Sequence, residues 1–188
     1  MTALTPANQL TLLRMLLIPA VVILVVYEHP GWALVVFATA GITDGLDGLI
    51  ARWSGQKTTL GAWLDPMADK LLLVTTFVVL TLPGLGLANR LPTWLTVLII
   101  SRDVVIVLTV AIVGLAFGPR TFRPSIFGKI ATATYILTIV VTMWFNYRQR
   151  TSVVVDVFVY ASLAITLVSS FHYIWHAARI IDEPSPMR

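Results

Sequence analysis

Four aspartates stand close together in a chain with few acids. The 188 residues include nine Asp and Glu, and four of these are Asp44, Asp47, Asp65 and Asp69. In helices, spacings of three and four residues would place each pair on one face. Four carboxylates in one pocket would repel one another without cations, and oxygen-only ligands suit hard ions, magnesium first and manganese second. The spacing therefore predicts a site for two metal ions that orients a phosphate for in-line displacement.

Small residues and one cation accompany these acids. Gly41, Gly45, Gly48 and Ala51 give their segment a nearly bare helix face, which lets a ligand or a neighbouring backbone approach closely. Arg52 follows as a fixed cation suited to a pyrophosphate oxygen. Helix packing alone would also explain the glycines, and we expect them to serve both purposes.

The elements that must position these residues are apolar helices. The chain is 57% hydrophobic and 12% charged, with a mean hydropathy of +0.87, which is far from the composition of soluble domains. Absence of cysteine excludes disulfides, thiolate zinc sites and cysteine nucleophiles. Because lipid offers no partner to unpaired backbone groups, the pattern predicts an all-α integral membrane bundle in one domain, 1–188. Its six transmembrane helices are expected at Leu10–Tyr27, Trp32–Arg52, Leu64–Leu82, Trp94–Phe117, Ile126–Phe145 and Val153–Ile174.

Basic residues give the expected orientation. They are more frequent at the two ends and after the second and fourth spans than in the other loops, so the positive-inside rule places both termini and the aspartates on the cytosolic side. No cationic segment precedes Arg14, so the first span is expected to stay as a helix rather than be removed as a signal peptide. A net charge of +4 then indicates contact with lipid headgroups and phosphorylated substrates, not nucleic acid. We expect a multi-pass protein of a bacterial inner (cytoplasmic) membrane.

One pattern joins the aspartates to their neighbours. It reads D-x2-D-G-x2-A-R-x8-G-x3-D-x3-D, from Asp44 to Asp69, and it resembles the signature of the CDP-alcohol phosphatidyltransferase family at every fixed position. The resemblance implies transfer of a phosphatidyl group from CDP-diacylglycerol to an alcohol, with CMP as leaving group and no covalent intermediate. It also implies a homodimer. By it, Asp44, Asp47 and Asp65 are metal ligands, Asp69 shares the cluster and acts as general base, and Gly48, Ala51 and Arg52 line the nucleotide pocket.

A second motif opens the first span. Asn8, Thr11 and Arg14 form N-x2-T-x2-R on one helical stripe, and this resembles the opening of the family's phosphatidylglycerophosphate and cardiolipin synthase branch. We interpret the three residues as supporting the site. The alternative is a helix cap followed by an arginine that extends toward the membrane surface.

Cations in the second half of the chain are candidates for binding the acceptor. Arg102 and Asp103 form either a structural pair within the fourth span or a site at which Arg102 reaches an anionic acceptor. Arg123 and Lys129 are the preferred partners of an acceptor phosphate, although the positive-inside rule alone would also place cations there. Asp156, His172 and His176 are interpreted as structural, and Lys70 as a cation that neutralises the charge beside Asp69, not as a catalyst.

The acceptor itself stays open between two alternatives. The stretch Leu64–Lys70 and the N-x2-T-x2-R opening resemble enzymes that use glycerol 3-phosphate, which we place first. Arg102-Asp103 and Pro124-Ser125 instead resemble the CMP-forming cardiolipin synthases, which use phosphatidylglycerol. A cation or proton transporter is the rival from another class, because intramembrane carboxylates also mark ion pathways. It would favour paired halves, which the sequence lacks. An inactive membrane scaffold is the third reading.

Overall fold

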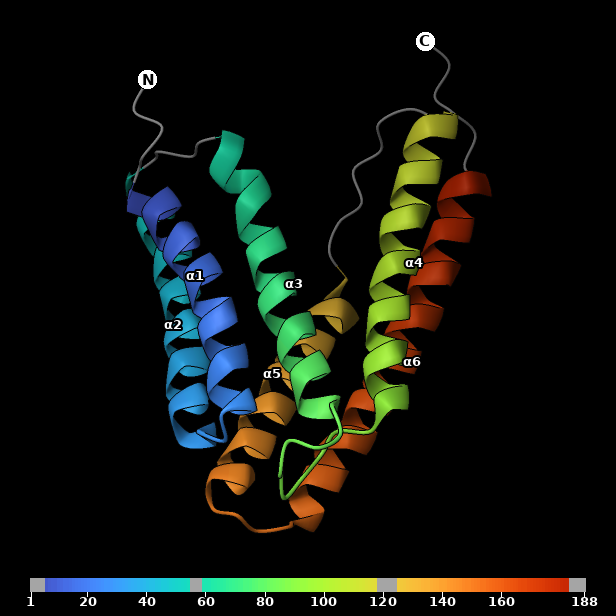
Figure 1. The fold of residues 1–188 in the computed structure, drawn as a ribbon. Helices are drawn as coiled ribbons and strands as arrows, with labels where there is room; N and C mark the ends of the chain where they lie inside the picture. The colour runs from blue at the N-terminus through green and yellow to red at the C-terminus, as the bar shows by residue number, and fades with distance from the viewer. Residues whose placement is uncertain (1–5, 55–58, 118–124, 183–188) are drawn as a thin grey trace. The chain divides into compact units, whose positions relative to one another are not determined.

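Six helices and no strand make up the part of the chain described by the computed structural model, residues 6–54, 59–117 and 125–182. Each apolar stretch expected from the sequence overlaps one helix, so the all-α prediction of six helices is confirmed (Figure 1). The helices are α1 (Pro6–Val26), α2 (Pro30–Ser54), α3 (Thr59–Thr81), α4 (Thr93–Phe117), α5 (Ile126–Tyr147) and α6 (Val153–Asp182).

The start of α3 differs from its expected position. The sequence predicts this helix from Leu64, which would put Pro66 in the opening turn. Instead α3 begins at Thr59, and Pro66 is its eighth residue. The intervening residues include Leu60 and Ala62, which are good helix formers. The helix therefore begins five residues earlier in the chain than predicted, and it lacks one backbone hydrogen bond at the proline.

Two helices in the described residues combine the length and the apolar character of membrane spans. These are Ile126–Tyr147, with a mean hydropathy of 1.7, and Val153–Trp175, with 2.0. Large apolar side chains such as Leu115 and Phe171 are 89% and 72% exposed, whereas Thr138 and Thr166 are fully buried. Apolar residues outside and polar residues inside are the distribution expected where hydrocarbon surrounds the helices. The other four expected spans remain predictions.

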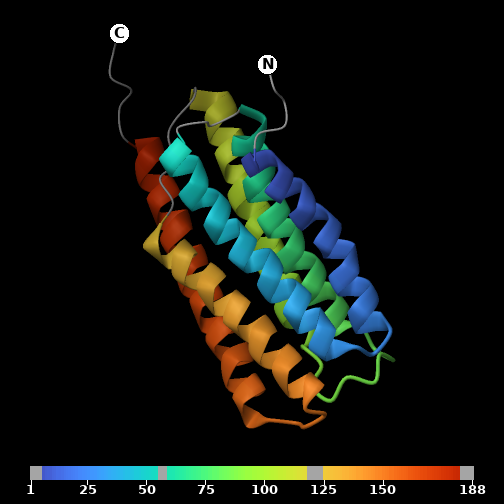
Figure 2. The same ribbon diagram turned by 90° about the vertical axis from the view of Figure 1, so that its left-hand side faces the viewer.

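The chain divides into two compact units, and α5 and α6 each contribute to both. The first unit contains Met1–Leu91 with Ile139–Val155, and the second contains Pro92–Thr138 with Asp156–Arg188. The two units do not test whether the chain is one domain, and the single domain stays a prediction. In the first unit, α1 packs against both α2 and α3, and Figure 2 shows the three as neighbouring helices. Its core includes Val21, Phe37, Phe77 and Met143, all at most 3% exposed.

Two asparagines join the segment after α3 to the end of α5 within the first unit. The Asn89 N–H donates to Asn146 Oδ1 at 2.7 Å, and Asn146 Nδ2 donates to the Asn89 carbonyl at 3.0 Å. Asn89 also donates to the Arg150 carbonyl and accepts from the Ser152 N–H. Each amide supplies hydrogen-bond partners that the backbone of an irregular segment lacks. The pair therefore holds the segment after α3 against the segment after α5.

Two helices of the first unit end in the same way, on a residue with positive φ that is not glycine. After α1, Glu28 has a φ of 61°, and after α5, Gln149 has a φ of 49°. The following amides reach back five residues, from His29 to the Leu24 carbonyl and from Arg150 to the Phe145 carbonyl. Both ends are Schellman caps, in which glycine is the usual residue because it has no Cβ.

Replacing Gln149 by Gly is therefore expected to stabilise the protein. Relief of the left-handed strain is worth about 1 kcal/mol, less the entropy that glycine adds to the unfolded chain. Thermal unfolding in detergent measures the effect, with Gln149→Ala as the control that removes the same exposed side chain but keeps the Cβ. An increase in melting temperature for Ala equal to that for Gly would show that the side chain, and not the backbone, is responsible.

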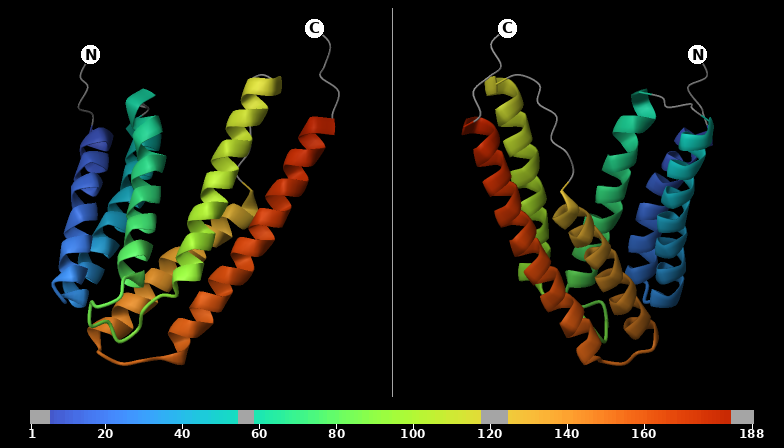
Figure 3. Two further views of the ribbon diagram at one scale, coloured as in Figure 1. Left: turned by 45° about the vertical axis from the view of Figure 1, so that its right-hand side comes forward. Right: turned by 180° about the vertical axis from the view of Figure 1, so that it is seen from behind.

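In the second unit, α6 packs along α4 and along the first part of α5. Hydroxyl pairs join α5 to α6: Tyr135 to Thr166 at 2.5 Å and Thr138 to Ser162 at 2.8 Å. Figure 3 shows α4 and α6 side by side, and the Trp94 ring on α4 lies 6.4 Å from the Tyr160 ring on α6. Small polar residues in these helices thus provide the interhelical hydrogen bonds that associate helices in an apolar medium.

Candidate active site

The predicted metal and nucleotide residues lie on the two helices that α1 contacts. Positions 44–52 belong to the second half of α2, and positions 61–69 belong to the first half of α3. In both helices the acids keep the spacing of three or four residues that places a pair on one helical face. The side chains of residues 44–66 lie outside the described part, so the following roles stay predictions: Asp44, Asp47 and Asp65 as metal ligands, and Gly48, Ala51 and Arg52 as nucleotide contacts.

Asp69 is the aspartate of the motif whose surroundings are described. It lies on α3, and Arg14 of α1 donates from Nη1 to its Oδ1 in an ion pair. The Asp69 side chain is 39% exposed, whereas that of Arg14 is completely buried. The first motif of the chain is thereby connected to the last residue of the second, a contact that the sequence did not specify.

Burial of Arg14 decides between an arginine inside the bundle and one that extends to the membrane surface. A charged side chain inside an apolar bundle is costly unless it has partners, and Arg14 with its neighbour Thr11, one turn earlier, is fully buried. The expectation that this stripe points into the bundle is confirmed for these two residues, and the alternative of an arginine extending to the membrane surface is wrong. The side chain of Asn8 lies outside the described part.

The donor set of the motif fits a hard divalent ion. Neither α2 nor α3 contains a histidine or cysteine, so their possible ligands in the motif are carboxylate oxygens. Asp69 presents its carboxylate with partial exposure. The described side chains include no group of three metal-ligating residues, and the other three aspartates of the motif lie outside them. Asp44, Asp47, Asp65 and Asp69 are the residues that would hold magnesium.

Arg102 takes part in a polar cluster of the second unit. It donates to Asp103 at 2.8 Å and to Ser169 of α6 at 2.6 Å, and its side chain is 11% exposed. A Cβ placed on Gly128 would lie 3.6 Å from Arg102 Nη2, so the first turn of α5 adjoins the guanidinium. The Ser125 hydroxyl caps that turn by accepting from the Gly128 N–H at 3.0 Å. The ion pair that one of the two alternatives for Arg102 and Asp103 requires is present, and contact of Arg102 with an acceptor stays a prediction.

The remaining acceptor candidates are placed less completely. Lys129 lies in the first turn of α5 and is exposed. It directly follows Gly128, which adjoins the Arg102 guanidinium. Arg123 lies outside the described residues, so its pairing with Lys129 stays a prediction. His172 packs its ring against Phe127 at 4.8 Å between centroids, in agreement with the structural role expected of it.

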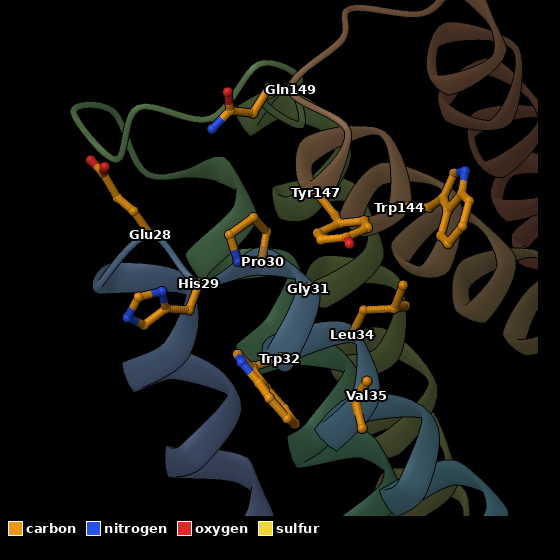
Figure 4. A pocket seen from close by; sticks show the side chains of 10 residues that line it. All are labelled: Glu28, His29, Pro30, Gly31, Trp32, Leu34, Val35, Trp144, Tyr147 and Gln149. Carbon is orange, nitrogen blue, oxygen red and sulfur yellow. The ribbon is translucent and has the colours of Figure 1, made fainter.

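A pocket of about 600 Å³ lies at the opposite end of the first unit, where α1 ends and α2 begins. Figure 4 shows that Glu28 and His29 lie on one side of it and the rings of Trp144 and Tyr147 on the other, without polar groups that converge. The Tyr147 ring covers Gly31 so closely that a Cβ there would come within 2.6 Å of it. Such aromatic residues at helix ends suit a membrane interface, and the pocket does not share residues with the motif.

Comparison with known proteins places the motif in a family. The family model described as CDP-alcohol phosphatidyltransferase matches residues 4–169, which include the whole motif. The chain is 33% identical to the CMP-forming cardiolipin synthase of Homo sapiens over 199 aligned positions, which cover 95% of this chain and 64% of that protein. A probable phosphatidylglycerophosphate synthase of Mycobacterium tuberculosis (strain ATCC 25618 / H37Rv) is 34% identical over 184 positions, 93% of this chain and 82% of its own length.

The cardiolipin synthase of Rattus norvegicus is similar at 34% identity, over 93% of this chain and 62% of its own length. The chain thus spans less than two thirds of these two mammalian relatives, and most of the phosphatidylglycerophosphate synthase. The match covers most of the chain and includes the helices that carry the aspartates, Arg14 and Arg102. The chain therefore belongs to the CDP-alcohol phosphatidyltransferase family.

Proposed function

We propose that this protein transfers a phosphatidyl group from CDP-diacylglycerol to an alcohol and releases CMP, a reaction of phospholipid biosynthesis. The observation that carries the proposal is the complete aspartate motif within the family match, on two helices that α1 contacts together. The family match gives the transporter and scaffold alternatives no support.

The chemistry assigns one task to each group of residues. Asp69 accepts the proton of the acceptor hydroxyl. At the same time the hydroxyl oxygen forms a bond to the phosphatidyl phosphorus, and the bond from that phosphorus to the CMP oxygen breaks. Gly48, Ala51 and Arg52 hold the nucleotide so that the leaving oxygen lies opposite the attacking one. The four aspartates would hold two magnesium ions, whose charge would neutralise that of the phosphates.

Glycerol 3-phosphate is the proposed acceptor, and phosphatidylglycerol is the second candidate. The M. tuberculosis protein named probable phosphatidylglycerophosphate synthase is matched over 82% of its length, which supports the first. The relatives named CMP-forming cardiolipin synthase and the Arg102–Asp103 pair favour the second. Either acceptor brings a phosphate to which Arg102, Arg123 and Lys129 offer charge-assisted hydrogen bonds.

The proposed setting is a bacterial inner membrane, with six spans, the motif facing the cytosol and two copies forming a homodimer. Two helices in the described residues meet the length and hydropathy of spans. A diacylglycerol-linked substrate stays in the bilayer, so an enzyme that accepts it must have access to lipid. Cytosolic placement of the motif would give CMP a direct way out.

An acceptor screen tests the proposal. Purified protein is given CDP-diacylglycerol and magnesium with glycerol 3-phosphate, phosphatidylglycerol, inositol phosphate or serine, while CMP release is followed and the lipid product is identified by mass spectrometry. Phosphatidylglycerophosphate is the expected product. Cardiolipin formed from phosphatidylglycerol alone would assign the second acceptor, and no CMP release with any acceptor would contradict the enzyme assignment.

A further inference from the structure

We propose that Arg14 is a positioning residue of the reaction, which holds the carboxylate of Asp69 in its working orientation. This rests on the role proposed for Asp69. The geometry that supports it is the ion pair between Arg14 Nη1 on α1 and Asp69 Oδ1 on α3. The ion pair joins two different helices of the first unit and involves a motif residue at each end.

The contrast in burial shows which side chain orients the other. Arg14 is completely enclosed, so packing restrains its guanidinium, whereas the Asp69 side chain is 39% exposed and is restrained less by packing. A guanidinium also offers a planar set of donors, and so it restrains the plane of a carboxylate better than the rotating ammonium of lysine does. The rigid partner is therefore the arginine, and the group that it restrains is the proposed base.

Position along α1 adds a second argument. Arg14 lies in the middle of the helix that contacts both α2 and α3, and Thr11, fully buried one turn earlier, lies on the same face. Because α1 contacts both α2 and α3, an ion pair from Arg14 holds the Asp69 carboxylate in a fixed position relative to both helices. Lys70, the next residue after Asp69, is exposed, so it is less restrained and is not expected to replace Arg14.

A purely structural role for Arg14 makes different predictions from a positioning role. Loss of a structural ion pair would lower stability and would affect nucleotide binding and turnover together. Loss of positioning would leave CDP-diacylglycerol binding in place and lower turnover, because misplacing a catalytic group by about 1 Å can cost roughly a hundredfold in rate.

The test compares Arg14→Met, Arg14→Gln and Arg14→Lys with Lys70→Met, the control that removes the neighbouring exposed cation. Steady-state assays give kcat and KM for CDP-diacylglycerol, and the increase in melting temperature on adding CDP reports nucleotide binding without turnover. We expect Arg14→Met and Arg14→Gln to lower kcat by roughly ten- to a hundredfold, with KM changed less than about threefold and the CDP effect kept. Arg14→Lys should recover part of kcat, and Lys70→Met, which removes a cation beside Asp69 but keeps the ion pair with Arg14, should lower kcat less than Arg14→Met does.

The outcomes separate this inference from the function on which it rests. Turnover of Arg14→Gln within about twofold of the unchanged protein, with Asp69→Asn inactive, would overturn the positioning role alone. Loss of the CDP effect in every folded Arg14 variant would also overturn it, in favour of a structural role. Near-normal turnover of Asp69→Asn would instead remove the proposed base, whatever Arg14 does. If Arg14→Met does not fold, Arg14→Gln and Arg14→Lys decide the question.

Discussion

Asp69→Asn is expected to abolish phosphatidyl transfer while nucleotide binding is largely kept. Asparagine has nearly the same shape as aspartate but cannot accept the proton of the acceptor hydroxyl, and a general base contributes roughly 10²- to 10⁴-fold to rate. The change should therefore appear in kcat. The proposed nucleotide contacts, Gly48, Ala51 and Arg52, are on α2 and are unchanged by the substitution.

Release of CMP from radiolabelled CDP-diacylglycerol measures the rate of transfer. An increase in melting temperature on adding CDP shows that the variant still binds nucleotide. Asp156→Asn is the matched control, because Asp156 is an exposed acid in the first turn of α6 and lies outside the motif. Turnover of Asp69→Asn close to that of Asp156→Asn would remove Asp69 as the base. Loss of CDP binding as well would indicate that the substitution disturbs the site as a whole.

The helices were predictable because hydropathy and turn residues mark them strongly. Each predicted stretch overlaps an observed helix, and the errors are at the ends, as at Thr59 of α3 and at Asp182, where α6 ends eight residues beyond the predicted Ile174. End positions depend on caps and on local backbone strain, which a hydropathy pattern does not contain. Glu28 and Gln149 illustrate this, since both have positive φ although neither residue type predicts a left-handed cap.

Partners across the bundle were harder to predict than the residues themselves. The motif of the first span points to Arg14, but its contact with Asp69 depends on how α1 and α3 pack, a property of the fold and not of spacing along the chain. The sequence offers the Arg102–Asp103 pair, between adjacent residues, as one of two alternatives, but it does not indicate the partner Ser169. Local pairs can be read from the sequence because the backbone already brings them together.

The sequence does contain one signal for these partners. Ser162, Thr166 and Ser169 are spaced by four and three residues in an otherwise apolar segment, which is the period of one helical face. All three are buried, and they meet Thr138, Tyr135 and Arg102. A polar stripe on an apolar helix therefore marks the face that turns toward other helices. Asn89 and Asn146 had no such period, and only the fold shows their pairing.

Removal of divalent ions is expected to stop CMP release, and added magnesium is expected to restore it. The proposed site brings four carboxylates to a substrate that itself carries a pyrophosphate, so without cations like charges would face one another. Charge stabilisation by bound metal is worth several kcal/mol in such reactions, which corresponds to at least about a thousandfold in rate. Manganese should restore activity less well than magnesium if the site keeps the order expected for oxygen ligands.

The measurement is CMP release after treatment with EDTA, followed by titration with magnesium or manganese. Asp44→Asn should raise the magnesium concentration needed for half-maximal rate, because it removes a negatively charged ligand, whereas Asp156→Asn should leave that concentration unchanged. Melting temperature with and without EDTA separates loss of catalysis from loss of the fold. Transfer that continues at an unchanged rate in EDTA would contradict the two-metal site while leaving the family assignment intact, since the assignment rests on the match over residues 4–169 and not on the metal.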